Sequence, residues 1–464
     1  MTDLAVEPDL PPAESADGRS IRIHNPADGT LVGDVAMATR EETASAVAAA
    51  RAVFPAWAAT PAEERAAALR SAADALADRA DDLAEINEAE TGRPAAQARE
   101  GVLAGVATLR QYAELGPLHR GRTLLGQQSA TDLMVPEPRG VVVVLTPWND
   151  PVAVACGLVG AALVTGNTVV AKPSERCPHT GALLGEVLRP HFPENVVRHL
   201  AGDGTVGSWL AGHEDVDVIA HVGSTDTGRS LAEAAARTGA KALLENGGND
   251  PLVIDGDVDP EWAAEQAATG AFANSGQICV AVERIFVHRA VAEPFVTALT
   301  AAAERAGLLP LVDLRHRKAV HEHVAQAVEA GARLRAGGVV SDGPGSLYPA
   351  TVLTGCDPAM RVMREETFGP VAPVCVVDEF AEGLALARDD AYGLAATVLT
   401  RSMAHAQQAW RALPVGTVKV NAVFGGAPGG AAHPRGASGH GYGYGPELLD
   451  ELTATKVVHV EPAP

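Results

Sequence analysis

The sequence predicts an α/β fold made of two parallel-sheet α/β domains and a small β arm. Three observations indicate this fold. Apolar runs that suit buried strands alternate with helical segments from residue 140 onward, the alternation begins again after Gly248, and a polar, strand-like stretch at 118–138 interrupts the first domain. Parallel strands need crossover connections, which are usually helices, so the alternation favours parallel sheets. Ligands bind such sheets at the carboxyl ends of the strands.

Residues 41–115 are predicted to be mainly helical. Thr60 precedes Pro61 and stands three residues before Glu63. We therefore expect Thr60 to cap a helix that begins at the proline, with the glutamate completing a capping box. Leu69 and Leu76 then share one face of this helix because they lie seven residues apart.

The alternating strands and helices of the first domain are expected to begin with the apolar run 141–145, which is typical of a fully buried strand. Its other predicted elements are a helix at 151–165 and strands at 168–171, 196–200, 216–222 and 241–244. In the second domain, helices are predicted at 260–273 and 291–306, with strands at 283–288 and near 371–377. A last apolar strand is expected at 453–460.

Charge and hydropathy exclude several classes of partner. The formal net charge is −22 over 464 residues, and a negative field repels nucleic acid phosphates and anionic membrane surfaces, so neither is expected as a partner. The apolar stretch at 151–164 is shorter than the roughly 18 residues that a membrane span needs. Residues 1–19 lack the basic and apolar regions of a signal peptide, and we expect them to form a loose tail.

Cysteine usage points to a reducing environment. The chain has five cysteines, an odd number, and no CxxC pair. This pattern argues against a disulfide framework and against a metal cluster, and it favours a cytoplasmic setting in which a reactive thiol survives. Apart from Cys279, the cysteines are expected to be buried, inert thiols, namely Cys156, Cys177, Cys356 and Cys375.

Cys279 closes the run 272–279, which reads Phe-Ala-Asn-Ser-Gly-Gln-Ile-Cys. Upstream of it, Glu245-Asn246-Gly247-Gly248 sets a glutamate before a glycine pair. The first run fits the pattern F-x-N-x-G-Q-x-C and the second is a variant of E-L-G-G-K. The chain thus resembles the NAD(P)-dependent aldehyde dehydrogenase superfamily over nearly its whole length, with the motifs in the family's order.

Aldehyde oxidation needs a nucleophile, because hydride leaves readily only from a tetrahedral adduct that carries an oxyanion. Cys279 can supply a thiolate once nearby dipoles or charges lower its pKa. Asn149 stands at the end of the predicted strand 141–145 in a Pro-Trp-Asn motif, and it is expected to hold the oxyanion together with the backbone N–H of Cys279. Glu245, with a pKa raised by partial desolvation, is expected to activate the water that hydrolyses the thioester.

Glu245 also bears on the product. In the resembled family this glutamate separates hydrolytic members from those that pass the acyl group to coenzyme A, so its presence favours a free carboxylic acid. Two alternatives stay open: a coenzyme A-acylating semialdehyde dehydrogenase, and a non-catalytic nucleotide-binding protein of the same fold. The absence of turnover with NAD still bound would favour the second.

Three segments together predict a site for NAD, although none is a GxGxxG motif. Lys172 and Glu175 follow the strand at 168–171 and match, by resemblance, residues that bind the adenosine ribose hydroxyls. A carboxylate there would repel a 2′-phosphate, which favours NAD. Because Lys172 and Arg176 could still attract that phosphate, NADP remains possible.

The second segment stands between a strand and a helix. Gly223, Ser224 and Gly228 belong to it, and the backbone N–H groups at the helix N-terminus could face the pyrophosphate.

The third segment is the run Glu-Glu-Thr-Phe-Gly-Pro at 365–370. By resemblance, Glu366 would hold the nicotinamide ribose and Phe368 would pack near the nicotinamide ring, with Trp148 lining the same cleft. Asp150 departs from the family, which usually carries an aromatic or large residue there. A carboxylate at the mouth of the substrate tunnel would make a cationic or polar aldehyde conceivable.

The resemblance also implies a division of the chain and an assembly. In the family, segments such as 118–138 and 453–460 pair into a small oligomerisation arm. We therefore expect a homodimer or homotetramer that acts on a small-molecule aldehyde. The expected boundaries are 1–117 and 139–246 for the NAD-binding domain, 247–440 for the catalytic domain, and 118–138 and 445–464 for the oligomerisation arm.

Overall fold

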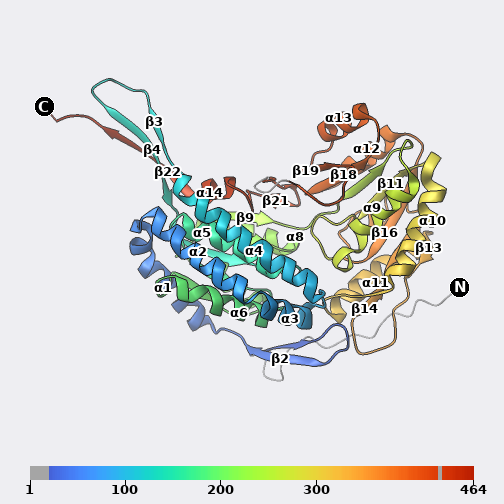
Figure 1. The fold of residues 1–464 in the computed structure, drawn as a ribbon, viewed down its shortest axis with the longest axis horizontal. Coiled ribbons are helices and arrows are strands. Elements are labelled where there is room, and N and C mark those ends of the chain that lie inside the picture. The colour runs from blue at the N-terminus through green and yellow to red at the C-terminus, as the bar shows by residue number, and fades with distance from the viewer. Residues whose placement is uncertain (1–19, 427–430, 464) are drawn as a thin grey trace.

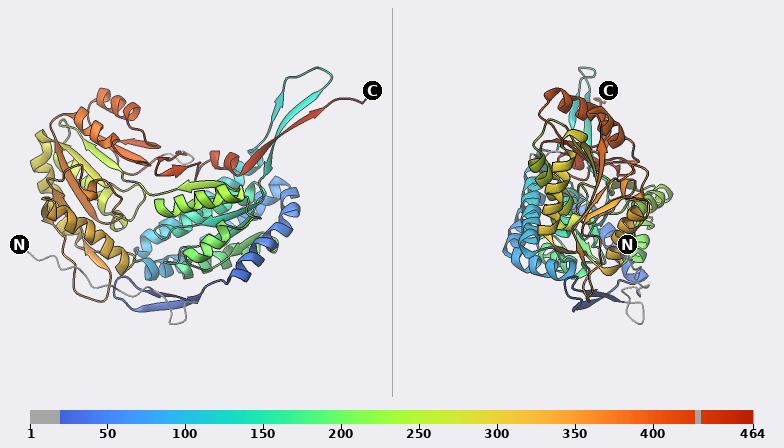
Figure 2. Two further views of the ribbon diagram at one scale, coloured as in Figure 1. Left: turned by 180° about the vertical axis from the view of Figure 1, so that it is seen from behind. Right: turned by 90° about the vertical axis from the view of Figure 1, so that its right-hand side faces the viewer.

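The computed structural model describes residues 20–426 and 431–463, so the tail expected at 1–19 lies outside the described residues. Two bodies, each with a central β-sheet covered by helices, stand side by side, and a thin β arm projects from the first of them (Figure 1). The reverse view shows the same two bodies bridged along one edge by a long hairpin (Figure 2). The predicted α/β class with parallel-dominated sheets is confirmed.

The first sheet runs in the order β21-β9-β8-β5-β6-β7. Its strands pair in parallel except for β21, which is antiparallel to β9 and sets Gly439 beside Glu245. Every residue of β5 is buried, as its run of valines predicts. The strands are β5 (Val141–Leu145), β6 (Thr168–Lys172), β7 (Val197–His199), β8 (Val218–Val222), β9 (Lys241–Glu245) and β21 (Gly439–His440).

Helices cover both faces of the first sheet. Alternate residues of β5 point to opposite faces, so Val142 and Val144 pack in one apolar cluster and Val141 and Val143 in another. The first face is covered by α2 (Ala62–Asp78), α3 (Ala80–Thr91), α4 (Ala95–Leu115), α5 (Pro151–Val164), α6 (Pro178–Leu188) and α14 (Glu447–Glu451). The second face is covered by α1 (Arg40–Ala59), α7 (Gly204–Ala211) and α8 (Thr225–Thr238).

The second sheet runs in the order β13-β15-β16-β11-β10-β18-β19, with β13 antiparallel to its neighbour. One face packs against α9 (Pro260–Phe272) and α10 (Arg289–Ala306), and the other against α11 (Leu314–Glu329), α12 (Phe380–Arg388) and α13 (Met403–Ala412). The strands are β10 (Pro251–Ile254), β11 (Arg284–His288), β13 (Arg333–Ala336), β15 (Thr351–Thr354), β16 (Val371–Val377), β18 (Ala395–Leu399) and β19 (Thr417–Val420).

Short strand pairs complete the molecule. The arm contains β3 (Arg122–Leu124), β4 (Thr131–Pro138) and β22 (Thr453–Val460), with β4 between the other two. The remaining pairs are β1 (Ser20–His24) with β2 (Leu31–Ala36), β12 (Leu308–Pro310) with β14 (Leu347–Pro349), and β17 (Tyr392–Gly393) with β20 (Arg435–Gly436).

Two predicted helix starts are wrong. Thr60 ends α1 rather than capping α2, because its hydroxyl donates to the carbonyl of Ala56 at 3.0 Å. The helix expected at 291–306 begins earlier, at Arg289, because the His288 side chain accepts the N–H of Ala290 at 3.1 Å and caps it there.

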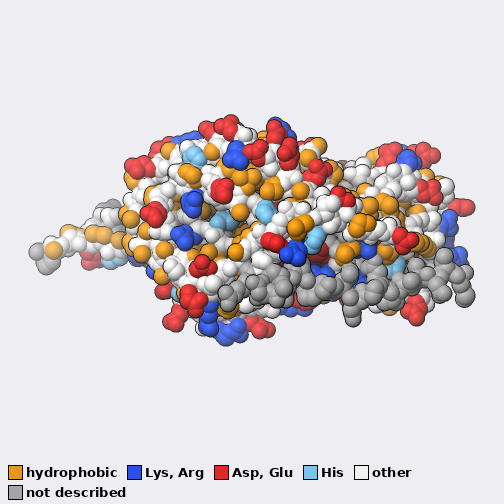
Figure 3. All heavy atoms as spheres, turned by 90° about the horizontal axis from the view of Figure 1, so that it is seen from below, with side chains coloured by type: hydrophobic (Ala, Val, Ile, Leu, Met, Phe, Trp, Pro, Cys, Tyr) orange, Lys and Arg blue, Asp and Glu red, His pale blue; other side chains and the backbone are white. Residues whose placement is uncertain are grey.

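The exposed surface mixes both signs of charge. On the face in Figure 3, acidic and basic side chains are scattered among apolar and uncharged ones rather than gathered in one basic patch. No helix in the described ranges combines the length and the apolarity that crossing a membrane requires.

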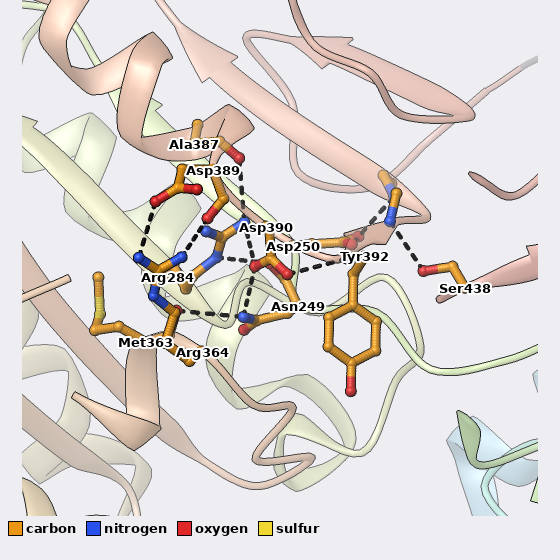
Figure 4. A network of polar contacts seen from close by, with 12 residues as sticks. Asn249, Asp250, Arg284, Met363, Arg364, Ala387, Asp389, Asp390, Tyr392 and Ser438 are labelled. Atoms are coloured by element: carbon orange, nitrogen blue, oxygen red, sulfur yellow. Dashed lines mark hydrogen bonds and ion pairs between the residues drawn. The ribbon is translucent and has the colours of Figure 1, made fainter. Parts of the chain in front are cut away.

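A buried polar network fixes the start of the second sheet (Figure 4). Arg284 pairs with Asp390 at 3.0 Å, and their side chains are only 3% and 4% exposed. The Arg284 Nε donates to the carbonyl of Asn249 at 2.8 Å, and the Asn249 amide donates to Asp390 at 2.8 Å. Asp250 accepts the N–H of Ala395 at 3.1 Å. The segment that leads into β10 is therefore tied to three neighbouring segments.

We predict that Asp390→Ala lowers the free energy of unfolding by about 3 to 5 kcal/mol, because Arg284 would keep a buried charge without its carboxylate. Urea unfolding followed by circular dichroism measures the loss. The matched control is Asp378→Ala, which breaks a pair with Arg289 whose side chains are both 66% exposed. It should lower the free energy of unfolding much less, because solvent screens that pair. Equal losses in the two variants would contradict the role of the buried pair.

Candidate active site

The predicted site segments of the first body meet at one edge of its sheet. Lys172 and Glu245 are the last residues of β6 and β9, and Trp148 and Asn149 follow β5. Because these strands are parallel, their carboxyl ends lie at the same edge, as expected for a ligand site. Cys279 comes from the second body, in the turn before β11.

The turn that carries Cys279 has an unusual backbone. Asn274, Ser275 and Gly276 have φ angles of 48°, 59° and 72°, so the chain is left-handed over three successive residues after α9. Gly276 is required because a Cβ there would lie 2.1 Å from the carbonyl oxygen of Gly369. The asparagine tolerates this backbone better than most residues do.

Side chains of the motif itself hold this turn in place. Gln277 donates to the carbonyls of Asn274 and Pro310 at 3.1 and 3.3 Å, and its Oε1 accepts the N–H of Val312 at 2.9 Å. Asn149 donates to the carbonyl of Gln277 at 3.0 Å. The predicted oxyanion residue thus lies against the turn of the predicted nucleophile.

Glu245 is held by a residue that sequence reasoning missed. Its Oε1 accepts the backbone N–H of Gly443 at 3.0 Å, and a Cβ at Gly443 would lie 2.2 Å from the Glu245 carboxyl carbon. Burial raises the pKa of Glu245, as predicted, while the Gly443 N–H acts in the opposite direction. In the sequence, Gly443 stands out only as one of several glycines in the C-terminal loop. Their spacing does not reveal that the N–H of Gly443 binds the Glu245 carboxylate.

The electrostatics of Cys279 differ from the expectation. The residue is half-buried, and burial raises the pKa of the Cys279 thiol to about 12 instead of lowering it. Neighbouring carboxylates add to the rise, and the positive charge of Lys419 opposes it. The carboxylates belong to Glu245, Asp250 and Glu366.

The glycine pair after Glu245 is explained by two close approaches. A Cβ at Gly247 would lie 2.1 Å from a carboxylate oxygen of Glu366, and one at Gly248 would lie 2.8 Å from the carbonyl oxygen of Cys279. Glu366 also accepts the N–H of Gly248 at 2.9 Å. Burial raises the pKa of Glu366 to about 7.

Phe368 is set by a buried glutamate that the sequence did not single out. Glu283 accepts the N–H groups of Thr367 and Phe368 at 3.0 and 2.9 Å and holds Phe368 at a φ of 53°. Burial raises the pKa of Glu283 to about 8. The Phe368 ring packs edge-on against Trp148, with 5.5 Å between centroids.

This aromatic contact belongs to a seam between the two bodies. His316 of α11 lies 5.7 Å from Trp148 and 6.0 Å from Phe368, measured between ring centroids. The guanidinium carbon of Arg176 lies over the Trp148 ring, 5.4 Å from the ring centroid. Arg176 also forms an ion pair with Asp313 at 3.1 Å. Trp148 is thus placed with Phe368, as the expected cleft requires.

The residues predicted to bind the adenosine ribose lie at the edge of the first sheet. Lys172 is buried, and its ammonium donates to the carbonyls of Pro173 and Gly202 at 2.7 and 2.9 Å. Burial lowers the pKa of Lys172, and the charge of Glu175 raises it, so the two side chains interact electrostatically.

The 223–228 segment forms the start of α8. Ser224 caps this helix by accepting the N–H of Thr227 at 3.4 Å. Gly228 leaves room for Asn246, whose Oδ1 would lie 2.0 Å from a Cβ at this position. The segment is therefore packed against the residue that follows Glu245.

Asp150 does not present a free carboxylate. It pairs with Arg93 at 2.8 Å, and Arg93 also donates to the carbonyl of Asn149 at 3.3 Å. The negative charge expected at the tunnel mouth is already balanced within the chain.

Comparisons with known proteins show the family of this chain. The model of the aldehyde dehydrogenase family matches residues 13–458. The chain is 34% identical over 421 residues to a succinate-semialdehyde dehydrogenase [NADP(+)] of Escherichia coli, covering 88% of this chain and 87% of that protein. It is 34% identical over 475 residues to a benzaldehyde dehydrogenase [NAD(+)] of Pseudomonas putida, covering 97% and 95%. The crystal structure of a Staphylococcus aureus betaine aldehyde dehydrogenase in complex with NAD+ superimposes with a TM-score of 0.93 at 30% identity, covering 97% of this chain and 93% of that one. The chain belongs to the aldehyde dehydrogenase family.

Proposed function

We propose that the protein oxidises an aldehyde to a carboxylic acid through a covalent adduct on Cys279, with NAD as the oxidant. The observation that carries the proposal is the convergence of Cys279, Asn149 and Glu245 from three separate segments. The Asn149 amide lies on the Cys279 turn, and the charge of Glu245 acts on the thiol. A nucleophile, an oxyanion donor and a base are the groups that this chemistry requires.

The residues at the sheet edge fit NAD. The related benzaldehyde dehydrogenase [NAD(+)] is named for this cofactor, and the betaine aldehyde dehydrogenase was crystallised in complex with NAD+. An ammonium has three donors, and two carbonyls use two of those on Lys172, so one is left for a ribose hydroxyl. We propose that Glu175 joins Lys172 at the adenosine ribose. Bound there, NAD supplies the acceptor for the hydride that leaves the adduct carbon.

We propose that the other cofactor contacts follow the two remaining segments. The start of α8 would bind the pyrophosphate through its N–H groups. Glu366 would hold the nicotinamide ribose, with Phe368 and Trp148 beside the nicotinamide ring. The residues at α8 are Gly223, Ser224 and Gly228.

In the first chemical step the S–H bond of Cys279 breaks, its proton leaves to solvent, and the thiolate sulfur forms a bond with the carbonyl carbon. The carbonyl π electrons move to oxygen, and the resulting oxyanion accepts hydrogen bonds from the Asn149 amide and the Cys279 backbone N–H. The Asn149 amide has two N–H donors, and the Gln277 carbonyl occupies one of them. Preorganised donors stabilise the adduct without reorganisation during the reaction.

The second step releases the acyl group from Cys279. Glu245 takes a proton from a water molecule, the water oxygen attacks the thioester carbon, and the C–S bond breaks to give a carboxylic acid and the thiolate. The Gly443 N–H holds the base in place. The raised pKa of Glu245 makes it a stronger base than an ordinary glutamate.

We also propose a cytoplasmic homodimer or homotetramer that assembles through the arm. Within the part of the chain that the structure describes, the outer strand β22 pairs on one side only, with β4. Its side chains Val457 and Val460 are 66% and 54% exposed. An unpaired edge with exposed β-branched residues is suited to pairing with another chain.

Cys279→Ala should abolish NADH formation, with a loss of about a thousandfold or more, because no other group forms the adduct. NAD binding should persist, as measured by isothermal titration calorimetry. Cys375→Ala is the control, since this thiol lies on β16 of the second sheet, and it should keep full activity. Turnover by Cys279→Ala would contradict the mechanism.

Glu245→Gln should leave acylation intact and slow deacylation by about 10² to 10⁴-fold. We expect a burst of NADH formation and the accumulation of an acyl-enzyme, which intact-mass spectrometry detects.

Gly443→Ala should also slow deacylation, because its Cβ would displace the Glu245 carboxyl group. Gly204→Ala is the control, since a Cβ there meets no neighbouring atom. A requirement for coenzyme A in product release would instead favour acyl transfer.

The deacylation rate of the wild type should fall as the pH decreases, because a general base must be deprotonated. Since burial raises the pKa of Glu245, the fall should begin at a higher pH than for an ordinary glutamate. Single-turnover measurements across the pH range test this. A rate that does not change down to the usual glutamate range would count against Glu245 as the base.

Val457→Glu combined with Val460→Glu should reduce the mass of the assembly to that of one chain, because the charges would be buried at the strand edge. Size-exclusion chromatography with light scattering measures the mass. Leu31→Glu on β2 is the control, as its side chain is 57% exposed away from the arm. A wild type that runs as a single chain would refute assembly through the arm.

A further inference from the structure

The backbone of Asn149 is held by an arginine that the proposed chemistry does not use. The Nη1 of Arg93 donates to the Asn149 carbonyl at 3.3 Å and lies 2.8 Å from Oδ1 of Asp150. The Arg93 side chain is only 14% exposed, so most of it is shielded from water. A single nitrogen therefore contacts both the residue proposed to bind the oxyanion and the residue that follows it.

Asp150 is diverted from a local role by this contact. It occupies the N-cap position of α5, where an aspartate usually accepts an N–H of the helix's first turn. Within the described part of the chain its side chain makes no such bond, and its carboxylate pairs with Arg93 instead. The segment that leads from Asn149 into α5 is thus tied to Arg93 through a carbonyl and through a carboxylate.

Gly101 of α4 leaves the room that this ion pair needs. A Cβ at Gly101 would lie 2.4 Å from Oδ1 of Asp150 and 3.1 Å from Nη1 of Arg93. A glycine inside a helix weakens the helix, and the close approach of the two charged groups gives a physical reason for this one. Any side chain at position 101 would push the pair aside.

Arg93 itself is placed by the loop between α3 and α4. Gly92 ends α3 with a φ of 75°. A Cβ at Gly92 would lie 2.6 Å from the Cβ of Pro310, whose carbonyl accepts a hydrogen bond from Gln277 at 3.3 Å. The loop that carries Arg93 therefore packs on the same segment that binds the Cys279 turn.

These contacts hold Asn149 at both its backbone and its side chain. Its carbonyl accepts hydrogen bonds from Arg93 at 3.3 Å and from the amide of Asn274 at 3.4 Å. Its own amide donates to the carbonyl of Gln277 at 3.0 Å. Because the Asn149 carbonyl and side chain belong to one residue, a rotation of its backbone would also move the amide. An oxyanion donor stabilises its adduct only where it is already in place.

We propose that Arg93, paired with Asp150, is a positioning residue that fixes the orientation of Asn149 toward the oxyanion of the aldehyde adduct. Asp150 then serves to hold Arg93 and does not select cationic aldehydes. The inference rests on the proposed function, in which Asn149 binds this oxyanion.

The experiment compares variants of the purified full-length enzyme with saturating NAD and the aldehyde that the wild type oxidises fastest. Arg93→Met removes the guanidinium at similar length. Arg93→Lys keeps the charge, and one ammonium nitrogen can make both of the observed contacts. The control is Arg99→Met, because Arg99 lies on α4 with a side chain that is 48% exposed and pairs with Asp81 at the surface.

Two quantities separate orientation of Asn149 from a general disturbance of the site. The ratio kcat/KM for the aldehyde includes adduct formation, which needs the oxyanion donor. Alkylation of Cys279 by iodoacetamide, measured without aldehyde or NAD, forms an S–C bond and releases iodide, so it generates no oxyanion. Peptide mass spectrometry follows this alkylation at Cys279 alone.

Arg93→Met should lower kcat/KM by about ten- to a hundredfold, since a misplacement of about 1 Å in a catalytic group has an effect of this size. The rate of Cys279 alkylation should not change. Arg93→Lys should recover most of the loss, and Arg99→Met should match the wild type. An unchanged kcat/KM in Arg93→Met would overturn the proposal. An equal loss in alkylation would overturn it as well, because it would show that the Cys279 turn itself had moved.

A double-mutant cycle tests whether Arg93 acts through Asn149. In the Asn149→Ala background, Arg93→Met should cause no further loss of kcat/KM, because the amide that Arg93 orients is absent. Losses that multiply in the double variant would overturn the proposal, since they would show that the two residues act independently.

Two aldehydes of the same shape distinguish positioning from substrate selection. Trimethylammonium acetaldehyde is a cation, and tert-butylacetaldehyde carries a neutral carbon in place of its nitrogen. Asp150→Asn, which removes the carboxylate charge at nearly constant size, should lower kcat/KM by the same factor for both. A loss confined to the cation would overturn the proposal, because it would show that Asp150 recognises the charge of the substrate.

The wild type separates this inference from the proposed function. A wild type that oxidises no aldehyde would refute the proposed function, and the inference with it. An active wild type whose kcat/KM is unaffected by Arg93→Met would refute the inference alone.

Discussion

The close packing of the segment between β9 and β10 is the constraint on which the site depends. Strand β9 of the first sheet ends at Glu245, and strand β10 of the second sheet begins at Pro251. Residues 246–250 therefore carry the chain from one body to the other. Gly247 admits the carboxylate of Glu366, and Gly248 admits the carbonyl of Cys279. Any side chain at these two positions would separate the segments that bear the proposed base and the proposed nucleophile. The buried network around Arg284 then fixes where the crossing segment enters the second sheet.

The same packing concentrates acidic groups around a thiol. Burial raises the pKa of Glu245, Glu283 and Glu366, and it acts in the same direction on Cys279. Buried carboxyl groups whose pKa values approach neutrality suit proton transfer, and such groups gather at functional sites. They also disfavour a thiolate, because each negative charge repels the next.

Local sequence was sufficient for most of the fold and for the residues named by motifs. The strands at 141–145 and 371–377 were predictable because their apolar runs suit buried strands, and the fold class followed from the alternation. Contacts between distant segments were not predictable. Gly443 lies 198 residues from Glu245, and nothing in a glycine-rich loop indicates which carboxylate its N–H will meet. Likewise, Asp150 looked like a free carboxylate because Arg93 reaches it from the loop between α3 and α4.

The turn before Cys279 shows why its motif residues occur together. Left-handed backbone costs of order 1 kcal/mol or more at a residue such as Ser275, so the turn persists only where its surroundings determine it. Gln277 holds much of this turn in place, because its side chain forms hydrogen bonds with three backbone groups on two segments. Asn149 adds a bond from the first body. The thiol is therefore presented from a turn that both bodies hold. Small shifts between the bodies would act directly on the geometry of the proposed nucleophile and the proposed oxyanion donor.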